Sequence, residues 1–373
     1  MAHLLAHPPL SRWWHLLLGA LLAAALMAPD ILSAATAHDT SKALTLPAPK
    51  PGHARPLIAI VAGNDGTETT DFTIPYGVLK ESGVADVVSV STVAGPVQLM
   101  PAMKIEADRT MAQFDAANPN GADIVIVPAQ HNDSNPKLIA WVRAQYAKGA
   151  TVVSICTGAI VVARAGLFDG KSATTHWHAI DDLAKEYPRT HWVRDRRYVQ
   201  DGRVISTTGI SASMPVSLAL VEAIAGPEAA ARTAKAMGAS QWSTQHHSAD
   251  FGLTMPRILL VAGNYLSFWR HETIDAPVTN GFDEVQLALA SDAWSQSFMT
   301  EVVTTSPDTK TVTSRHGLVL IPDARPDAAH AKLAAHDVPS LQALNRALGD
   351  IDARYGKATG DFAAMSMEYD RAQ

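Results

Sequence analysis

Residues 151–177, TVVSICTGAIVVARAGLFDGKSATTHW, carry the strongest structural pattern in the chain. They open on a β-branched apolar run, residues 151–155, which is typical of a buried strand. Cys156, the only cysteine in the sequence, follows at once, and Thr157-Gly158 leads into an Ala-rich run suited to a short helix. A glycine-rich turn ends that helix. The pattern predicts strand, sharp turn and helix, with a thiol at the corner.

The position of Cys156 indicates two roles. At the start of a helix the dipole favours thiolate over thiol, and the backbone N–H groups that follow can stabilise an oxyanion. The alternative is a small, buried and inert side chain, which is common for a free cysteine. The corner geometry and Gly158 favour the reactive role.

Three segments together resemble a known family: the Cys-Thr-Gly-Ala corner at 156–159, the Ala-Gly-Leu-Phe-Asp-Gly turn at 165–170 and the Ala-Thr-Thr-His-Trp segment at 173–177. They are similar to the ThiJ/PfpI superfamily, a branch of the class I glutamine-amidotransferase-like proteins. Within it the resemblance is strongest to the sensor domains of AraC-type regulators and to isonitrile hydratases. It extends over residues 56–251, roughly half of the chain.

The fold class follows from alternating strand and helix patterns. Apolar runs at 56–63, 87–92 and 122–128 are separated by helical patterns, such as the amphipathic residues 137–148. This alternation predicts an α/β fold with a doubly wound, mainly parallel sheet, and the resemblance implies the flavodoxin-like form with a cysteine elbow. Sites in such folds lie at the carboxyl ends of the strands, where Cys156 falls.

The N-terminal region has the three parts of a secretory signal peptide. A basic start precedes an apolar core at 16–27, and a small-x-small motif at 35–37 predicts cleavage after Ala37. We therefore expect a signal peptide over 1–37, a proline-containing linker over 38–55 and a periplasmic or secreted protein. An uncleaved anchor is the alternative, although the apolar core is shorter than the ~20 residues of a membrane-spanning helix.

The sequence restarts after the family-like region, because residues 258–264, ILLVAGN, echo residues 58–64, IAIVAGN, at an offset of 200. We interpret 252–326 as a smaller, truncated half-repeat of the same fold without the cysteine elbow, and 327–373 as a helical tail. Coincidence is the alternative, since such strand ends are common in α/β proteins.

Asp71 is the candidate partner of Cys156. It is expected to open the first helix, and in the resembling family an acid at this place contacts the cysteine sulfur. A protonated carboxyl there can donate a hydrogen bond to the sulfur, so the resemblance implies a raised pKa. The alternative is a helix N-cap. Thr157 stands where PfpI-type proteases have histidine, which weighs against peptidase activity, and the late His-x-Glu of true amidotransferases is missing.

The remaining site predictions concern binding. Ala129 and Gln130 stand where the resembling family usually has two glycines. Their backbone N–H groups are expected as oxyanion donors, without the tight approach that glycine permits. Gly158 and His176 are expected to line the pocket. His176 and His178 are at strand spacing, but without a third ligand they are a weak metal signal. We expect neither a metal nor another cofactor.

Three hypotheses for the function remain open. The first is an exported, cysteine-dependent hydratase or hydrolase-like enzyme acting on a small electrophile. The second is a non-catalytic small-ligand binding or sensor protein, and the third is a structural dimerisation module. A net charge of −6 without a basic cluster argues against nucleic-acid binding. No stable membrane anchor is expected after cleavage, and the family resemblance implies a homodimer.

Overall fold

The computed structural model describes residues 43–239 and 242–371, so the predicted signal peptide lies outside the described residues. Its central sheet has seven strands in the order β11-β12-β8-β7-β1-β3-β6. All neighbours are parallel except β11 and β12. The bounds are β1 Leu57–Ala62, β3 Asp86–Ser91, β6 Arg109–Thr110, β7 Ile124–Val127, β8 Thr151–Ser154, β11 Tyr198–Asp201 and β12 Val204–Thr207. The predicted mainly parallel α/β sheet is confirmed.

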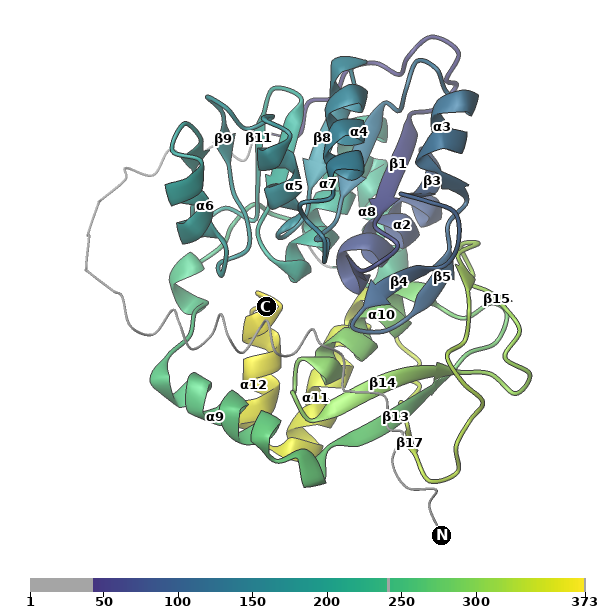
Figure 1. Ribbon diagram of the computed structural model, residues 1–373, viewed down its shortest axis with the longest axis vertical. Helices are drawn as coiled ribbons and strands as arrows, with labels where there is room; N and C mark the ends of the chain where they lie inside the picture. Colours follow the sequence, from purple (N-terminus) through teal and green to yellow (C-terminus); the bar gives the residue numbers. More distant parts are fainter. Residues whose placement is uncertain (1–42, 240–241, 372–373) are drawn as a thin grey trace.

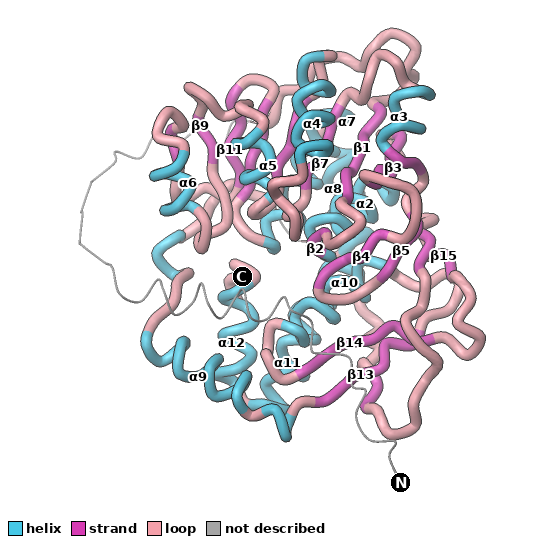
Figure 2. Tube along the Cα trace, viewed as in Figure 1, coloured by secondary structure: helices cyan, strands magenta, loops and turns pink. Residues whose placement is uncertain are grey.

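Helices cover both faces of this sheet (Figure 1; Figure 2). Alternate β1 side chains face opposite layers, because successive residues of a strand point to opposite sides. Ile58 and Ile60 belong to one apolar cluster, and Ala59 and Val61 to the other. The first cluster includes α2 Thr69–Ser82, α7 Ser213–Ala225 and α8 Pro227–Met237; the second includes α3 Met111–Ala117, α4 Pro136–Ala147 and α5 Gly158–Arg164.

Shorter elements complete this first unit. They are β2 Thr67–Glu68, the hairpin of β4 Val97–Met100 and β5 Lys104–Glu106, the pair β9 Ser172–Ala173 and β10 His191–Trp192, α6 Ile180–Glu186 and the 3₁₀ turn Ile210–Ala212 before α7. Residues 43–55 contain no helix or strand.

A second unit, residues 272–371, has elements in the same order as the first part of this fold. β13 Glu272–Pro277, α10 Glu284–Ser295, β15 Val312–Thr313 and β16 Val319–Leu320 begin 215 residues after β1, α2, β4 and β5 (272 − 57), and β14 Thr300–Thr305 corresponds to β3. The match extends to hydrogen bonds. Asp108 accepts from the backbone N–H and hydroxyl of Ser89, and Asp323 accepts from the same two groups of Thr304.

The C-terminal helices belong to the same second unit. The 3₁₀ turn Ser340–Gln342, α11 Ala343–Tyr355 and α12 Lys357–Ser366 begin 130 residues after the 3₁₀ turn at 210–212, α7 and α8 (343 − 213). The second unit therefore has counterparts of the beginning and end of the first. Within the described residues it has no counterpart of β8 and the cysteine corner.

The strand expected at 258–264 is wrong. These residues lie in α9 Met255–Leu266, and the counterpart of β1 is β13, so the offset of 200 was also wrong. Thr254 before the helix and Pro256 in its first turn are helix-start signals that outweigh the local similarity. The expected helical tail also contains a short strand, β17 Ala331–Lys332, which pairs with β13.

The two units share one core. Helix α2 packs against α10, and β5 pairs with β16, so that the two hairpins form one sheet in the order β15-β16-β5-β4-β2. One apolar cluster includes Phe72 and Ile74 of α2 together with Val285 and Leu289 of α10. The second unit thus covers a face of the first that would otherwise expose these side chains to water.

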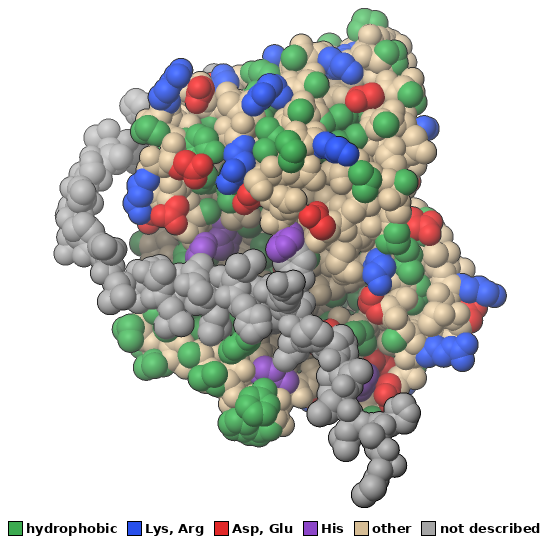
Figure 3. Space-filling view, viewed as in Figure 1, with side chains coloured by type: hydrophobic (Ala, Val, Ile, Leu, Met, Phe, Trp, Pro, Cys, Tyr) green, Lys and Arg blue, Asp and Glu red, His purple; other side chains and the backbone are tan. Residues whose placement is uncertain are grey.

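Helix α9 turns part of its apolar surface outward. Leu259 and Leu266, with Phe268 and Trp269 just after the helix, are more than 60% exposed. Figure 3 shows hydrophobic side chains on this edge of the molecule. None of the helices in the described parts of the chain is both long and apolar enough to cross a membrane.

Candidate active site

Cys156 lies at a sharp corner between β8 and α5, as predicted. Its φ of +55° is in the left-handed region, which is strained for a residue with a side chain. Its backbone N–H donates to Thr208 O, at the end of the neighbouring β12, over 3.2 Å. A Cβ on Gly158 would lie 2.1 Å from Val127 O, so only glycine allows α5 to start so close to β7.

The thiol of Cys156 is enclosed by acids. The residue is 5% exposed, and burial raises its pKa well above the usual range. The nearby Asp71, Glu68 and Glu368 raise it further, while the backbone N–H of Thr157 favours the thiolate. The thiolate expected from the helix dipole is therefore outweighed, and the thiol is protonated at neutral pH in this closed arrangement.

Asp71 is the third residue of α2 and is fully buried. Glu68 is the N-cap of this helix, and its side chain accepts from Asp71 N, so the N-cap interpretation of Asp71 is excluded. Asp71 Oδ2 accepts from Ala129 N over 3.1 Å, whereas Oδ1 has no hydrogen-bond partner. Burial raises the pKa of Asp71 to about 7, which agrees in direction with the family resemblance. The side chain therefore keeps its proton to a much higher pH than an exposed aspartate does.

Two further carboxyl groups stand behind Asp71. The hydroxyl of Thr70 donates to Glu68 at 2.9 Å and lies 3.3 Å from Asp292 Oδ2 on α10. Burial raises the pKa of both Glu68 and Asp292. The charge of Asp71 raises the pKa of Glu68 further, and the charge of Glu68 raises that of Asp292. Like charges at such short range cannot all ionise, so the group holds protons at neutral pH.

One of the predicted oxyanion donors, the backbone N–H of Ala129, has another role. Ala129 N already binds Asp71, and the side-chain oxygen of Gln130 accepts from Gly63 N at 2.8 Å and from Thr67 Oγ1 at 3.0 Å. Both residues therefore fix the end of β7. Of the predicted donors, the backbone of Thr157 is the one that acts on the cysteine sulfur.

His176 lies close to the cysteine corner. Its neighbour Thr175 donates from its hydroxyl to Cys156 O over 2.9 Å, and His176 Nε2 lies 3.0 Å from Ser366 O. The strand ends at Ala173, however, so His176 and His178 follow in a turn and do not share a strand face as expected. Among the described residues, no group of three histidine, cysteine or acidic side chains is arranged to hold a metal ion.

Sequence reasoning missed the second unit's part in this site. Asp292 and Glu368 both come from it, and both act electrostatically on the Asp71–Cys156 region. The available signal was the repeat of helix patterns at an offset of 130. At this offset Glu368 corresponds to Gly238, the glycine that ends α8. No local motif marks either acid.

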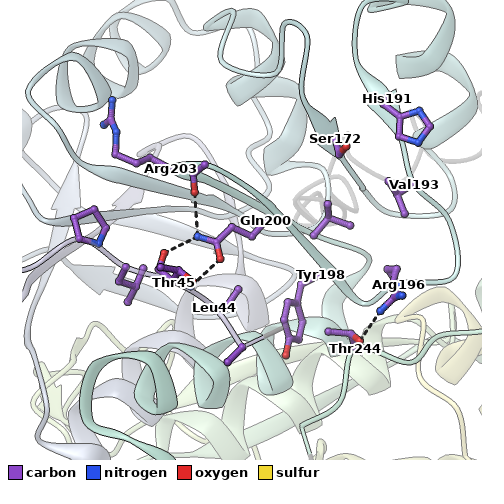
Figure 4. Close-up of a pocket in the computed structure, with 15 residues that line it drawn as sticks. Leu44, Thr45, Ser172, His191, Val193, Arg196, Tyr198, Gln200, Arg203 and Thr244 are labelled. Atoms are coloured by element: carbon purple, nitrogen blue, oxygen red, sulfur yellow. Dashed lines mark hydrogen bonds between the residues drawn. The ribbon is translucent and has the colours of Figure 1, made fainter. Parts of the chain in front are cut away.

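A groove of about 870 Å³ lies away from this site, against β11 (Figure 4). Residues 43–47 form part of its wall, and Thr45 and Gln200 exchange two hydrogen bonds there. Its lining includes Arg196 and Tyr198 but not Cys156 or Asp71. The groove is therefore separate from the cysteine chemistry.

Comparisons with known proteins agree with this geometry. The model of the DJ-1/PfpI family matches residues 57–223. The chain is 30% identical over 182 residues to the Parkinson disease protein 7 homolog of Danio rerio, covering 47% of this chain and 93% of that protein. It is 30% identical over 164 residues to the isonitrile hydratase of Pseudomonas putida, covering 43% of this chain and 68% of that protein.

A regulator and a solved structure match different shares of their own lengths. The HTH-type transcriptional regulator CdhR of Pseudomonas aeruginosa is 31% identical over 149 residues, or 39% of this chain, which thus spans only 43% of the regulator's length. The crystal structure of Drosophila melanogaster DJ-1beta aligns with a TM-score of 0.45 and 22% identity, covering 50% of this chain and 99% of that one. On the sequence matches, the chain belongs to the DJ-1/PfpI family.

Proposed function

We propose that the protein is a cysteine-dependent enzyme that adds water to a small, uncharged electrophile, with an isonitrile as the first substrate class to test. The observation that supports this most is the pairing of Cys156, strained at the strand–helix corner, with a buried Asp71 whose pKa is about 7. A carboxyl group whose pKa lies near the operating pH can both accept and return a proton. The isonitrile hydratase relative supports the choice of substrate class.

The proposed reaction needs only water as co-substrate. Cys156 Sγ bonds to the terminal carbon of R–N≡C while its proton passes to ionised Asp71. The proton then moves to that carbon, which gives a thioimidate, R–N=CH–S. Water adds to the carbon, the C–S bond breaks, the thiol regains a proton, and R–NH–CHO leaves. The N–H of Thr157, which favours the thiolate, stabilises sulfur when it carries negative charge.

The surroundings favour a small and uncharged substrate. Cys156 is 5% exposed, and Asp71, Glu68 and Glu368 all act on it as negative charges or proton holders. An anionic substrate would meet like charges in a medium of low dielectric constant. A neutral, slender electrophile is not repelled by these acids and needs little space to reach the buried thiol.

The second candidate is a small-ligand binding or sensor protein. The occupied Ala129 N–H and the raised pKa of Cys156 favour it, because both weaken the usual means of catalysis. The regulator relative supports it as well. Binding without turnover would raise the melting temperature in the presence of ligand without forming product.

We also propose that the protein is exported, and that it can form a homodimer. Support for export comes from the sequence of residues 1–37, with cleavage expected after Ala37. N-terminal sequencing of the mature protein from its native host tests the site: a start at His38 is expected, and an intact Met1 on cytoplasmic protein contradicts export. The mass of the purified protein by sedimentation tests the dimer.

The function is tested with cyclohexyl isocyanide and the wild-type chain, by following N-cyclohexylformamide by mass spectrometry. Turnover should be lost in Cys156→Ser and reduced at least 100-fold in Asp71→Asn, and unchanged in the control Asp182→Asn, whose side chain is 82% exposed. Product formed equally by Cys156→Ser would contradict the proposal. A shift in melting temperature without product would support the binding candidate.

A further inference from the structure

We propose that Glu368, supplied by the second unit, is a positioning and selectivity residue of the Cys156 site: its side chain joins the two segments that flank the cysteine corner and lies within electrostatic range of the thiol. The proposal extends the proposed function, on which it rests for its catalytic meaning. Its geometry is independent of any substrate.

The carboxylate of Glu368 bridges the two segments that hold the backbone of Cys156. Thr208 O accepts from Cys156 N, and the next residue, Gly209, donates its N–H to Glu368 Oε2. On the other side Thr175 donates to Cys156 O, and two residues later Trp177 donates its N–H to Glu368 Oε1 over 3.2 Å. One side chain therefore fixes both walls of the corner.

The end of α12 reinforces this bridge. Met367 O accepts from Ser211 N at 3.0 Å, and Glu368 O accepts from Ser211 Oγ at 2.6 Å. A Cβ on Gly209 would come within 2.4 Å of Glu368 Oε2 and 2.6 Å of His176 Cδ2. Gly209 thus leaves room for the carboxylate between the first unit's chain and His176. In Figure 1 the C-terminal end of α12 points toward the half of the molecule that holds the central sheet.

Glu368 is an unfavourable choice on structural grounds alone. Its backbone has a φ of +52°, a conformation that glycine adopts most easily, and the matching position after α8 is Gly238, with a φ of +81°. The residue is 1% exposed, and burying a carboxylate is costly. Strained backbone and buried charge at one residue are typical of functional positions.

A second buried polar group faces the same carboxylate. His246 is 4% exposed, and its Nε2 lies 3.4 Å from Glu368 Oε1 without forming a hydrogen bond. The guanidinium of Arg197 is also within electrostatic range of Glu368. On the cysteine side the titratable groups are Cys156, Asp71 and Glu68, with Asp292 behind them. Glu368 therefore lies within electrostatic range of His246 and Arg197 as well as of the thiol.

The test compares full-length wild type with Glu368→Gln, which keeps the side-chain volume, and Glu368→Gly, which suits the left-handed backbone. Cys156 is the only cysteine, so the difference in absorbance at 240 nm between each protein and its Cys156→Ala counterpart, which cancels the seven tyrosines, reports its titration even where reagents cannot enter. In both variants we expect the thiolate fraction at a given pH to rise about two- to threefold, because Glu368 is the smallest of the three acidic influences on the thiol. The ratio of alkylation rates, iodoacetate to iodoacetamide, should rise in the same direction.

A purely structural role would change the melting temperature but leave the titration and the ratio of rates unchanged, and this result would overturn the proposal. Asp361→Asn, on the same helix but on the surface, is the control and should change neither. If the shift occurs but isonitriles are not hydrated, the proposed function fails and the role of Glu368 stands. If the wild type hydrates isonitriles but neither variant shifts the titration of Cys156, the proposed function stands and the role of Glu368 fails.

Discussion

The backbone N–H of Ala129 donates a 3.1 Å hydrogen bond to Asp71 Oδ2, while Asp71 Oδ1 is buried without a partner. The bond ties the carboxyl group of α2 to the end of β7 and takes up one N–H that was expected to stabilise an oxyanion. The site is built to hold a proton, since burial has raised the pKa of Asp71 to about 7.

This raised pKa predicts how stability depends on pH. An unfolded aspartate ionises near pH 3.8, so between about pH 4 and 7 the folded chain holds a proton that the unfolded chain has lost. The free energy of unfolding therefore falls as the pH rises through this window, by a few kcal/mol at most. Asp71→Asn should remove much of this fall, so its stability relative to wild type should improve from pH 5 to pH 8. Urea unfolding at several pH values measures it, and parallel curves for the two proteins would contradict it.

Gly158→Ala should be strongly destabilising. The new Cβ would lie 2.1 Å from Val127 O. This oxygen belongs to the backbone of β7, which cannot shift as easily as the end of a flexible side chain. We expect a loss of roughly 3 kcal/mol or more. The matched control is Gly349→Ala in α11, where a Cβ would meet no atom within 4 Å and should stabilise the helix by about 0.5–1 kcal/mol. Urea unfolding of the two variants should therefore give changes of opposite sign.

Asp292→Asn should lower the pKa of Asp71, because the negative charge of Asp292 is one of the causes that raise it. Titration of the carboxyl carbons by nuclear magnetic resonance measures the shift. The control Glu301→Gln, at an exposed position of β14 in the same unit, should leave the pKa of Asp71 in place. An unchanged Asp71 titration in Asp292→Asn would show that the second unit does not influence the acid.

The first unit alone should not fold stably. A chain ending at residue 252 would expose Phe72, Ile74 and other α2 side chains that now lie in one core with α10. We expect this truncated chain to aggregate or to lack a cooperative unfolding transition, as followed by circular dichroism. The full chain should unfold in a single transition. A soluble truncated chain with cooperative unfolding would contradict the shared core.

The sequence was sufficient for the first unit because local patterns and tertiary packing agree there. The apolar runs that become β1, β7 and β8 are buried, and the Cys156–Gly158 corner is where its motif indicated. The second unit was harder to predict. Residues 258–264 resemble β1 in their letters, yet helix-start residues decide their structure. The true counterpart, β13, contains Glu272 and Asp275 and resembles β1 little.

The electrostatics of the site could not be predicted from local sequence. Asp292 and Glu368 reach the Cys156 region only because the two units pack together, over separations of more than 200 residues from Asp71. The helix dipole alone favours a thiolate, but the pKa of Cys156 also depends on burial and on nearby acids that no sequence motif identifies. Tertiary context therefore reversed the expected ionisation of the thiol.

The most direct test of the account is the pH dependence of Cys156 alkylation by iodoacetamide in wild type and Asp71→Asn. If Asp71 and Cys156 form one proton-sharing site, the wild-type thiol should titrate above the free value of ~8.5, and the variant should titrate lower and react faster at pH 8. Identical profiles for the two proteins, or a cysteine that reacts only after unfolding, would contradict the claim that Cys156 and Asp71 act together.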